Sequence, residues 1–308
     1  MGNFTQRLIY PQKVLQAENV RATINHLLGL DLRQMPVGDI KGMLRTAFEG
    51  YQVKAHRFRP GIRLFRGRAC DKPQNISAML YPPPDRAPLN RANQPGKPVL
   101  YCCASRQTPF FELRPSVGAC LAIALWETTA SMFVNHAGYT RNSFERLGSA
   151  RTETHNFRKT SRPSIHDEIT ENLAEIFTRP SPQEGDHLYH LTSIVADFLF
   201  GDDQFDGLLY PTIAMRANSD NIAVKPRYAD NHLRFLKAEY IRVEEVGDFN
   251  YRITILDTAS KLDDRGAILW RGRLPQWAMS DGREQLNFIV ENGEWVARDT
   301  AGNIVEPE

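Results

Sequence analysis

Basic and amide side chains gather in two stretches of the sequence. Residues 54–68, KAHRFRPGIRLFRGR, are strongly basic, yet the whole chain has a net charge of only +2. A few arginines suffice to bind a pyrophosphate, so these residues favour a compact anionic ligand over nucleic acid. Residues 210–226, YPTIAMRANSDNIAVKP, place several polar side chains between two apolar pieces. That is more than a surface turn needs, although Asn218 and Asn221 as simple turn residues are the alternative.

The best-known catalytic motifs are absent from the sequence. It has no phosphate-binding G-x-x-x-x-G-K-[ST], no G-x-G-x-x-G, no G-x-S-x-G and no H-E-x-x-H. His187 and His190 have no cysteine or carboxylate partner at ligand spacing, so we expect no metal. No cysteine pair has the C-x-x-C spacing, which favours reduced thiols at all four cysteines: Cys70, Cys102, Cys103 and Cys120.

The elements that must position these side chains form an α+β pattern. Apolar runs predict strands at 61–69, 97–104, 119–129, 205–212 and 221–226. Apolar–polar alternation after residue 236 predicts β-hairpins, with turns at Gly247-Asp248 and Asn292-Gly293. Helical periodicity predicts helices at 17–30, 38–51, 166–179 and 187–201.

Two further segments complete this pattern. Thr108 as N-cap and Pro109 at the first helical position predict a short helix that carries Glu112. The polar, basic residues 133–165 are expected to cross the surface without entering the core.

Composition places the chain among globular proteins. It has 308 residues, of which 42% are hydrophobic and 24% charged. The N-terminus has no apolar signal region, and no apolar segment approaches the ~18 residues of a membrane span. We therefore expect a cytoplasmic protein with no membrane partner.

The order of the motifs across residues 51–226 resembles the RES domain family. LFRGRA, LNRANQPGKPVLY, TPFFELRP, DGLLYPT and a late asparagine follow one another as they do in that family. Matched positions are the family's two arginines, its tyrosine, its glutamate, its late serine and its late asparagine: Arg66, Arg91, Tyr101, Glu112, Thr212 and Asn221. Threonine at 212 keeps the hydroxyl of the usual serine but adds a methyl group.

The resemblance implies a fold similar to the ADP-ribosyltransferases of the diphtheria-toxin kind. That fold would have a mixed or antiparallel β core with flanking helices. Residues 51–236 would form the NAD-binding domain, residues 1–50 a helical extension, and residues 237–308 a β-rich extension packed on the same domain. RES members are bacterial toxins of toxin–antitoxin pairs that break the nicotinamide–ribose bond of NAD⁺, which is their substrate and not a cofactor.

The resemblance also implies roles for the matched residues. Glu112 would stabilise the positive charge that develops on the ribose, with Tyr101 and Arg66 beside it as catalytic residues. Arg66 and Arg91 would clamp the pyrophosphate, and Tyr101 would stack on the nicotinamide or the ribose. Thr212 and Asn221 would bind ribose or phosphate oxygens.

Three functions remain open from the sequence. The first is an NAD⁺ glycohydrolase or phosphorylase that depletes NAD⁺. The second is an ADP-ribosyltransferase acting on a protein, and the third is a nucleotide-binding module without catalysis. A cognate antitoxin or a protein acceptor would be the macromolecular partner.

Overall fold

A computed structural model describes most of the chain. The described residues are 5–8, 18, 20, 22–23, 25–26, 35–48, 51–155, 157, 164–180, 187–201, 203–247, 250–271, 283–291, 294–298 and 301–304. In these ranges, no helix has both the length and the hydropathy required to cross a membrane.

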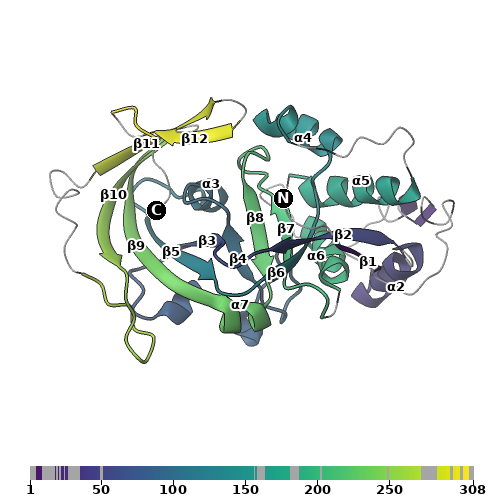
Figure 1. Ribbon diagram of the computed structural model, residues 1–308, viewed down its shortest axis with the longest axis horizontal. Coiled ribbons are helices and arrows are strands. Elements are labelled where there is room, and N and C mark those ends of the chain that lie inside the picture. The colour runs from purple at the N-terminus through teal and green to yellow at the C-terminus, as the bar shows by residue number, and fades with distance from the viewer. Residues whose placement is uncertain are drawn as a thin grey trace.

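The described strands join into one curved sheet that crosses the whole molecule (Figure 1). Its strand order is β1-β2-β6-β7-β8-β4-β3-β5-β9-β10-β11-β12. Only β6 and β7 pair in parallel, so the sheet is mostly antiparallel, as expected. The strands are β1 Thr5–Leu8, β2 Gln52–Phe58, β3 Arg63–Ala69, β4 Leu100–Cys103, β5 Cys120–Thr128, β6 Met132–His136, β7 Gly207–Pro211, β8 Asp220–Val224, β9 Leu233–Val246, β10 Asn250–Ala259, β11 Arg283–Glu291 and β12 Glu294–Arg298.

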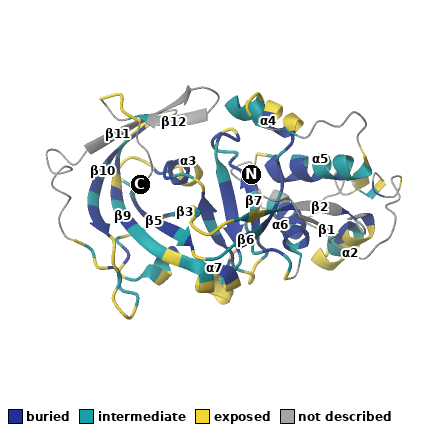
Figure 2. Ribbon diagram, in the orientation of Figure 1, coloured by how far each residue is buried: buried dark blue, intermediate teal, exposed yellow. Residues whose placement is uncertain are grey.

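Helices cover the sheet in three places. They are α2 Val37–Phe48, α3 Thr108–Leu113, α4 Arg141–Leu147, α5 Ile165–Thr178, α6 His187–Phe200 and α7 Pro226–His232. Helices α2, α5 and α6 lie together at one end of the molecule (Figure 1), where Leu44, Phe177 and Val195 share a core with Leu208 of β7. Among the described residues of these three helices, the exposed ones lie on α2, whereas α5 and α6 are buried or intermediate (Figure 2).

Two smaller cores complete the packing. Helix α3 lies inside the curve of the sheet (Figure 1), where Phe110 and Phe111 pack with Tyr251 and Ile253 of β10. On the other face of the central strands, Tyr228 of α7 shares a third core with the residues Leu64, Leu100, Trp126 and Val224. Helix α3, which carries Glu112, therefore packs in a different hydrophobic core from helices α2, α5 and α6.

Most expected elements are found, including both tail hairpins, in which β9 pairs with β10 and β11 with β12. The first expected helix falls largely outside the described residues, although Val20 is helical and buried. The all-helical expectation for residues 1–50 is wrong at β1, which pairs with β2. Helix α3 starts one residue away from the expectation, because Gln107 and not Thr108 is the N-cap.

The expectation of a surface excursion over residues 133–165 is wrong for its first part. Strand β6 lies inside the sheet with Val134 fully buried, and Phe144 of α4 is also fully buried. Asn135 is buried too, but its amide donates to the Leu199 carbonyl at 2.8 Å. Internal hydrogen bonding therefore allows a polar segment to enter the core.

The sheet continues across the domain boundaries expected from the sequence. The boundary at residue 236 falls inside β9, whose pairing with β5 extends from Leu233 to Arg242. At the other boundary, β2 pairs with both β1 and β6. One set of backbone hydrogen bonds thus connects all three segments.

Candidate active site

Helix α3 presents Glu112 on its exposed side. Thr108 and Pro109 occupy its first turn, and proline suits that position because its missing N–H has no helical partner there. The helix ends at Arg114, which adopts a left-handed conformation (φ 46°) and donates its N–H to the Phe110 carbonyl at 3.0 Å. Phe110 is fully buried while Glu112 is exposed, so the packing of α3 fixes the direction of the carboxylate.

Gly67 lets α3 lie directly on strand β3. A Cβ atom at this position would overlap the ring of Pro109, and it would lie 3.2 Å from Leu113 Cδ1. Any larger residue would therefore displace the helix. The position of Glu112 depends on this close approach.

Two buried donors hold the Glu112 carboxylate. Thr212 Oγ1 donates a hydrogen bond to Glu112 Oε1, and Asn221 Nδ2 donates to the same oxygen at 2.7 Å. Thr212 is fully buried and Asn221 is 7% exposed, which makes both donors rigid. In the described residues, no donor contacts Oε2. The carboxylate is fixed through one oxygen and offers the other outward.

Antiparallel pairing brings these residues together. Asn221 of β8 lies opposite Tyr210 of β7 on one side and opposite Cys103 of β4 on the other. Thr212 follows directly after β7, and its N–H donates to the Ser219 carbonyl at 2.9 Å. The backbone hydrogen bonds at the start of β8 therefore fix the positions of both Thr212 and Asn221.

Arg66 is a half-buried cation without a carboxylate partner among the described residues. Its Nη1 donates to the Tyr101 carbonyl at 3.1 Å, and its Nε is buried with no hydrogen-bond acceptor. Burial lowers the pKa of Arg66, because desolvation disfavours the charged form. Among the described residues, no carboxylate offsets this charge. Such a guanidinium is suited to an anionic ligand.

Arg91 has structural partners as well as access to the same region. Its Nη1 donates to the carbonyls of Phe177 (2.7 Å) and Arg179 (3.3 Å) at the C-terminal end of α5, and it lies 5.5 Å from the ring centre of Tyr189. A cation at this helix end is favourable for folding. Arg91 therefore supports α5 whether or not it binds a ligand.

Tyr101 lies between the two arginines. Burial raises the pKa of Tyr101, and the charges of Arg66 and Arg91 partly offset this rise. Its hydroxyl donates to Asn93 Oδ1 at 2.8 Å and accepts from the Ala92 N–H at 3.0 Å. These bonds fasten the loop that follows Arg91, and they leave the ring, not the hydroxyl, for contact with a ligand.

The other polar side chains of residues 210–226 brace the loop itself. Asn218 Oδ1 accepts the Ala150 N–H at 2.8 Å, and Asp220 accepts from Tyr139 at 2.8 Å and from Arg151 at 3.0 Å. Ser219 shares a 2.7 Å hydrogen bond with Thr108, which also ties the loop to α3. Thr212 and Asn221 differ from these bracing residues, because their side chains donate to Glu112.

Tyr210 is a neighbour that the sequence analysis did not select. It is buried, and its pKa is raised well above the usual value by burial and by the nearby Tyr101 and Glu112. Arg91 also acts on it electrostatically. The sequence did contain a signal for Tyr210. This residue lies two residues before Thr212, and residues two apart in an extended chain lie on the same face.

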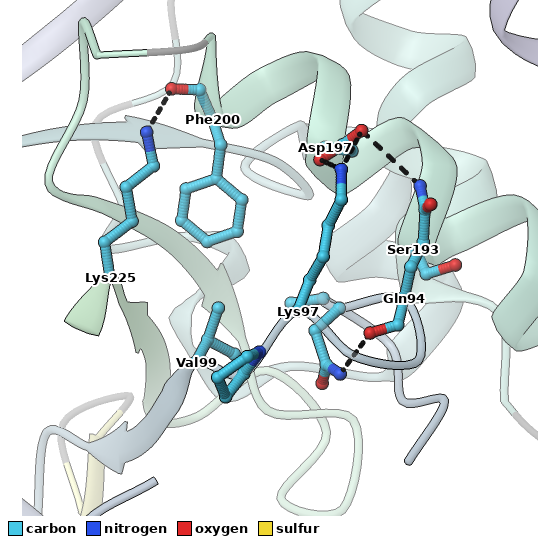
Figure 3. Close-up of a pocket in the computed structure, with 10 residues that line it drawn as sticks. Gln94, Lys97, Val99, Ser193, Asp197, Phe200 and Lys225 are labelled. Atoms are coloured by element: carbon cyan, nitrogen blue, oxygen red, sulfur yellow. Dashed lines mark hydrogen bonds and ion pairs between the residues drawn. The ribbon is translucent and has the colours of Figure 1, made fainter. Parts of the chain in front are cut away.

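A separate cavity of about 230 Å³ opens beside the loop that follows Arg91 (Figure 3). Asp197 binds Lys97 at 3.0 Å and Lys41 at 2.5 Å, and Lys225 also lines the cavity, so positive charge is in excess there. Burial alone would raise the pKa of Asp197, but these two lysines lower it overall. The lining residues are Ala92, Asn93, Gln94, Lys97, Pro98, Val99, Ser193, Asp197, Phe200 and Lys225.

No protein-family model matches this chain, and no curated protein has a matching sequence. Within the described ranges, no cluster of three or more His, Cys, Asp or Glu side chains could hold a metal ion. The geometry around Glu112 is therefore the basis for a function.

Proposed function

We propose that this protein cleaves the nicotinamide–ribose bond of NAD⁺, with water as the acceptor. The observation that carries this proposal is a pair of groups. One is the Glu112 carboxylate, which is held through one oxygen, and the other is the half-buried Arg66 guanidinium, which has no carboxylate partner among the described residues. NAD⁺ supplies the complement of both groups, because it joins an anionic pyrophosphate to a ribose that becomes cationic as the bond breaks.

Glu112 would act on the ribose. As the bond between C1′ and the pyridinium nitrogen breaks, its electron pair goes to nicotinamide, which leaves as a neutral molecule. The ribose becomes oxocarbenium-like, and the negative charge on the outward Oε2 stabilises it. Water then adds to C1′ and loses one proton to solvent, so the products are ADP-ribose, nicotinamide and a proton. No strong general acid is required.

Arg66 and Arg91 would hold the pyrophosphate, and the ring of Tyr101 would pack against the ribose or nicotinamide. Thr212 and Asn221 act differently from the sequence-based expectation in this proposal. They hold Glu112 in place, because both donate to its Oε1. Fixed donors of this kind keep a carboxylate oriented without reorganisation during the reaction.

The same site suits the wider proposal of a toxin related to the RES family. Its sheet would then be of the ADP-ribosyltransferase-like type, and its action would be NAD⁺ depletion in the cytoplasm until an antitoxin binds. Phosphate or a protein side chain in place of water would make the protein a phosphorylase or an ADP-ribosyltransferase.

Incubation of the purified protein with NAD⁺, without added metal, tests the proposal. We expect nicotinamide and ADP-ribose in equal amounts, and Glu112→Gln should abolish most of the release. A parallel reaction with phosphate would yield ADP-ribose phosphate if phosphate is the acceptor. Adenylate-labelled NAD⁺ with a bacterial lysate would label protein if protein is the acceptor. Intact NAD⁺ under all three conditions would overturn the proposal.

A further inference from the structure

Tyr210 has a hydroxyl that the fold does not use. In the part of the chain that the structure describes, no group forms a hydrogen bond with this hydroxyl, and its oxygen is not among the buried polar atoms sealed off without a partner. The oxygen therefore reaches accessible space, although the residue as a whole is buried. Buried tyrosines normally give their hydroxyl a partner.

The surroundings of the hydroxyl belong to the candidate site. Tyr101, Glu112 and Arg91 all act on it electrostatically. The ring is fixed from behind, because it meets Phe177 of α5 edge-on with centroids 5.2 Å apart. Backbone pairing with Asn221 fixes the strand on which it stands. The hydroxyl is thus held at the site by contacts that do not involve its oxygen.

The chemistry of the hydroxyl favours donation to an anion. Burial and the negative charge of Glu112 both oppose ionisation, so the phenol keeps its proton at neutral pH. Beside Arg91, a neutral donor can bind a phosphate oxygen without adding another charge to the site. Glu112 offers an acceptor only, so it cannot perform this task when ionised.

We infer that Tyr210 contacts the substrate and donates a hydrogen bond to a phosphate oxygen of its pyrophosphate, next to Arg91. This inference rests on the proposed function for the identity of the ligand. Tyr210 would then determine affinity for the ADP-ribose part that substrate and product share, and it would leave the bond-breaking step to Glu112. That division distinguishes it from a catalytic stabiliser, whose loss lowers kcat.

The test compares Tyr210→Phe with Tyr228→Phe. Tyr228 is a matched control because it is also a buried tyrosine, but its hydroxyl donates to the Ala130 carbonyl, away from the site. For Tyr210→Phe we expect the Kd of ADP-ribose, measured by calorimetry, and the KM for NAD⁺ each to rise roughly tenfold, with kcat within about threefold. Tyr228→Phe should lower the melting temperature and leave both constants unchanged.

The outcomes separate this inference from the proposed function. Unchanged Kd and KM in Tyr210→Phe would overturn the inference while the cleavage proposal stands. If wild-type protein binds ADP-ribose but releases no nicotinamide, the cleavage proposal fails, and the change in Kd alone decides the role of Tyr210. If wild-type protein binds neither ADP-ribose nor NAD⁺, both are overturned.

Discussion

Replacement of Glu112 by glutamine removes one charge and keeps the shape of the side chain. Glutamine retains one acceptor oxygen, so Thr212 and Asn221 can still donate to it as they do to Glu112 Oε1. The outward oxygen becomes an amide, which cannot stabilise a cation. Loss of one electrostatic stabiliser costs about 2.7–4 kcal/mol in the transition state, so kcat should fall roughly 100- to 1,000-fold.

The same substitution should change folding and binding only slightly. Charged hydrogen bonds are stronger than neutral ones by about 1 kcal/mol each, and solvent screening at the exposed Glu112 reduces the total for two bonds to about 1 kcal/mol. An unfolding entropy of about 2.1 cal/mol/K per residue then gives a melting shift of about 2 °C for 308 residues. The Kd of NAD⁺ should stay within about tenfold.

Chromatographic measurement of nicotinamide release, calorimetry with NAD⁺ and thermal melting together check this prediction. Glu127→Gln is the control, because Glu127 also accepts a hydrogen bond, from Arg234 at 2.5 Å, but lies outside the site. Full turnover in Glu112→Gln would refute the electrostatic reasoning. A melting temperature lower by ten degrees or more would show instead that the carboxylate stabilises the fold, and the lost activity would then carry no mechanistic meaning.

Three further predictions follow from the site and its surroundings. Arg66→Met should raise the free energy of unfolding by about 1 kcal/mol, since it removes a half-buried cation whose Nε is buried without a hydrogen-bond acceptor, while NAD⁺ affinity falls at least tenfold; a loss of stability would contradict the uncompensated charge. Gly67→Ala should lower the free energy of unfolding in urea by about 1–3 kcal/mol and should also lower kcat, because the new methyl group would displace α3. Unchanged values of both would show that the helix tolerates the methyl group. Asp197→Asn should destabilise the protein at neutral pH, because Lys41 and Lys97 lower the pKa of Asp197 below its value in the unfolded chain. The stability from this lowered pKa is complete above about pH 4 and is lost as the pH falls through the folded pKa, so wild type and variant should converge in acid melts.

The sequence identified the side chains of the candidate site better than it identified their partners. Motif order was enough to select Arg66 and Glu112, which the sheet brings into one region. The bonds from Thr212 and Asn221 to Glu112 depend on the register between β4, β7 and β8, which a single sequence does not reveal. Arg91 was selected as a ligand residue, but nothing in its local sequence indicates that it also binds the end of α5.

The errors in the fold have physical causes as well. Strand β6 is short and carries Asn135, whose polarity suggests the surface, although the Leu199 carbonyl satisfies it inside the core. Strand β2 overlaps the basic run 54–68, and it shows no clean alternation, because the buried Ala55 and the exposed Arg57 are two residues apart and lie on the same face. Apolar strands such as β5 and β7 were recognised because their entire length is buried or nearly so.

Glu112 precedes its two hydrogen-bond donors by 100 and 109 positions in the chain. At a synthesis rate of roughly 5–20 residues per second, Glu112 would be synthesised about 5–20 s before Thr212 and Asn221. A nascent or truncated chain that stops before Thr212 has neither donor, so its glutamate is an ordinary exposed carboxylate. The pairing of β4 with β8 closes a loop of similar length, which is a slow event compared with local helix formation. The proposed NAD⁺ cleavage could therefore begin only after nearly three quarters of the chain has been synthesised.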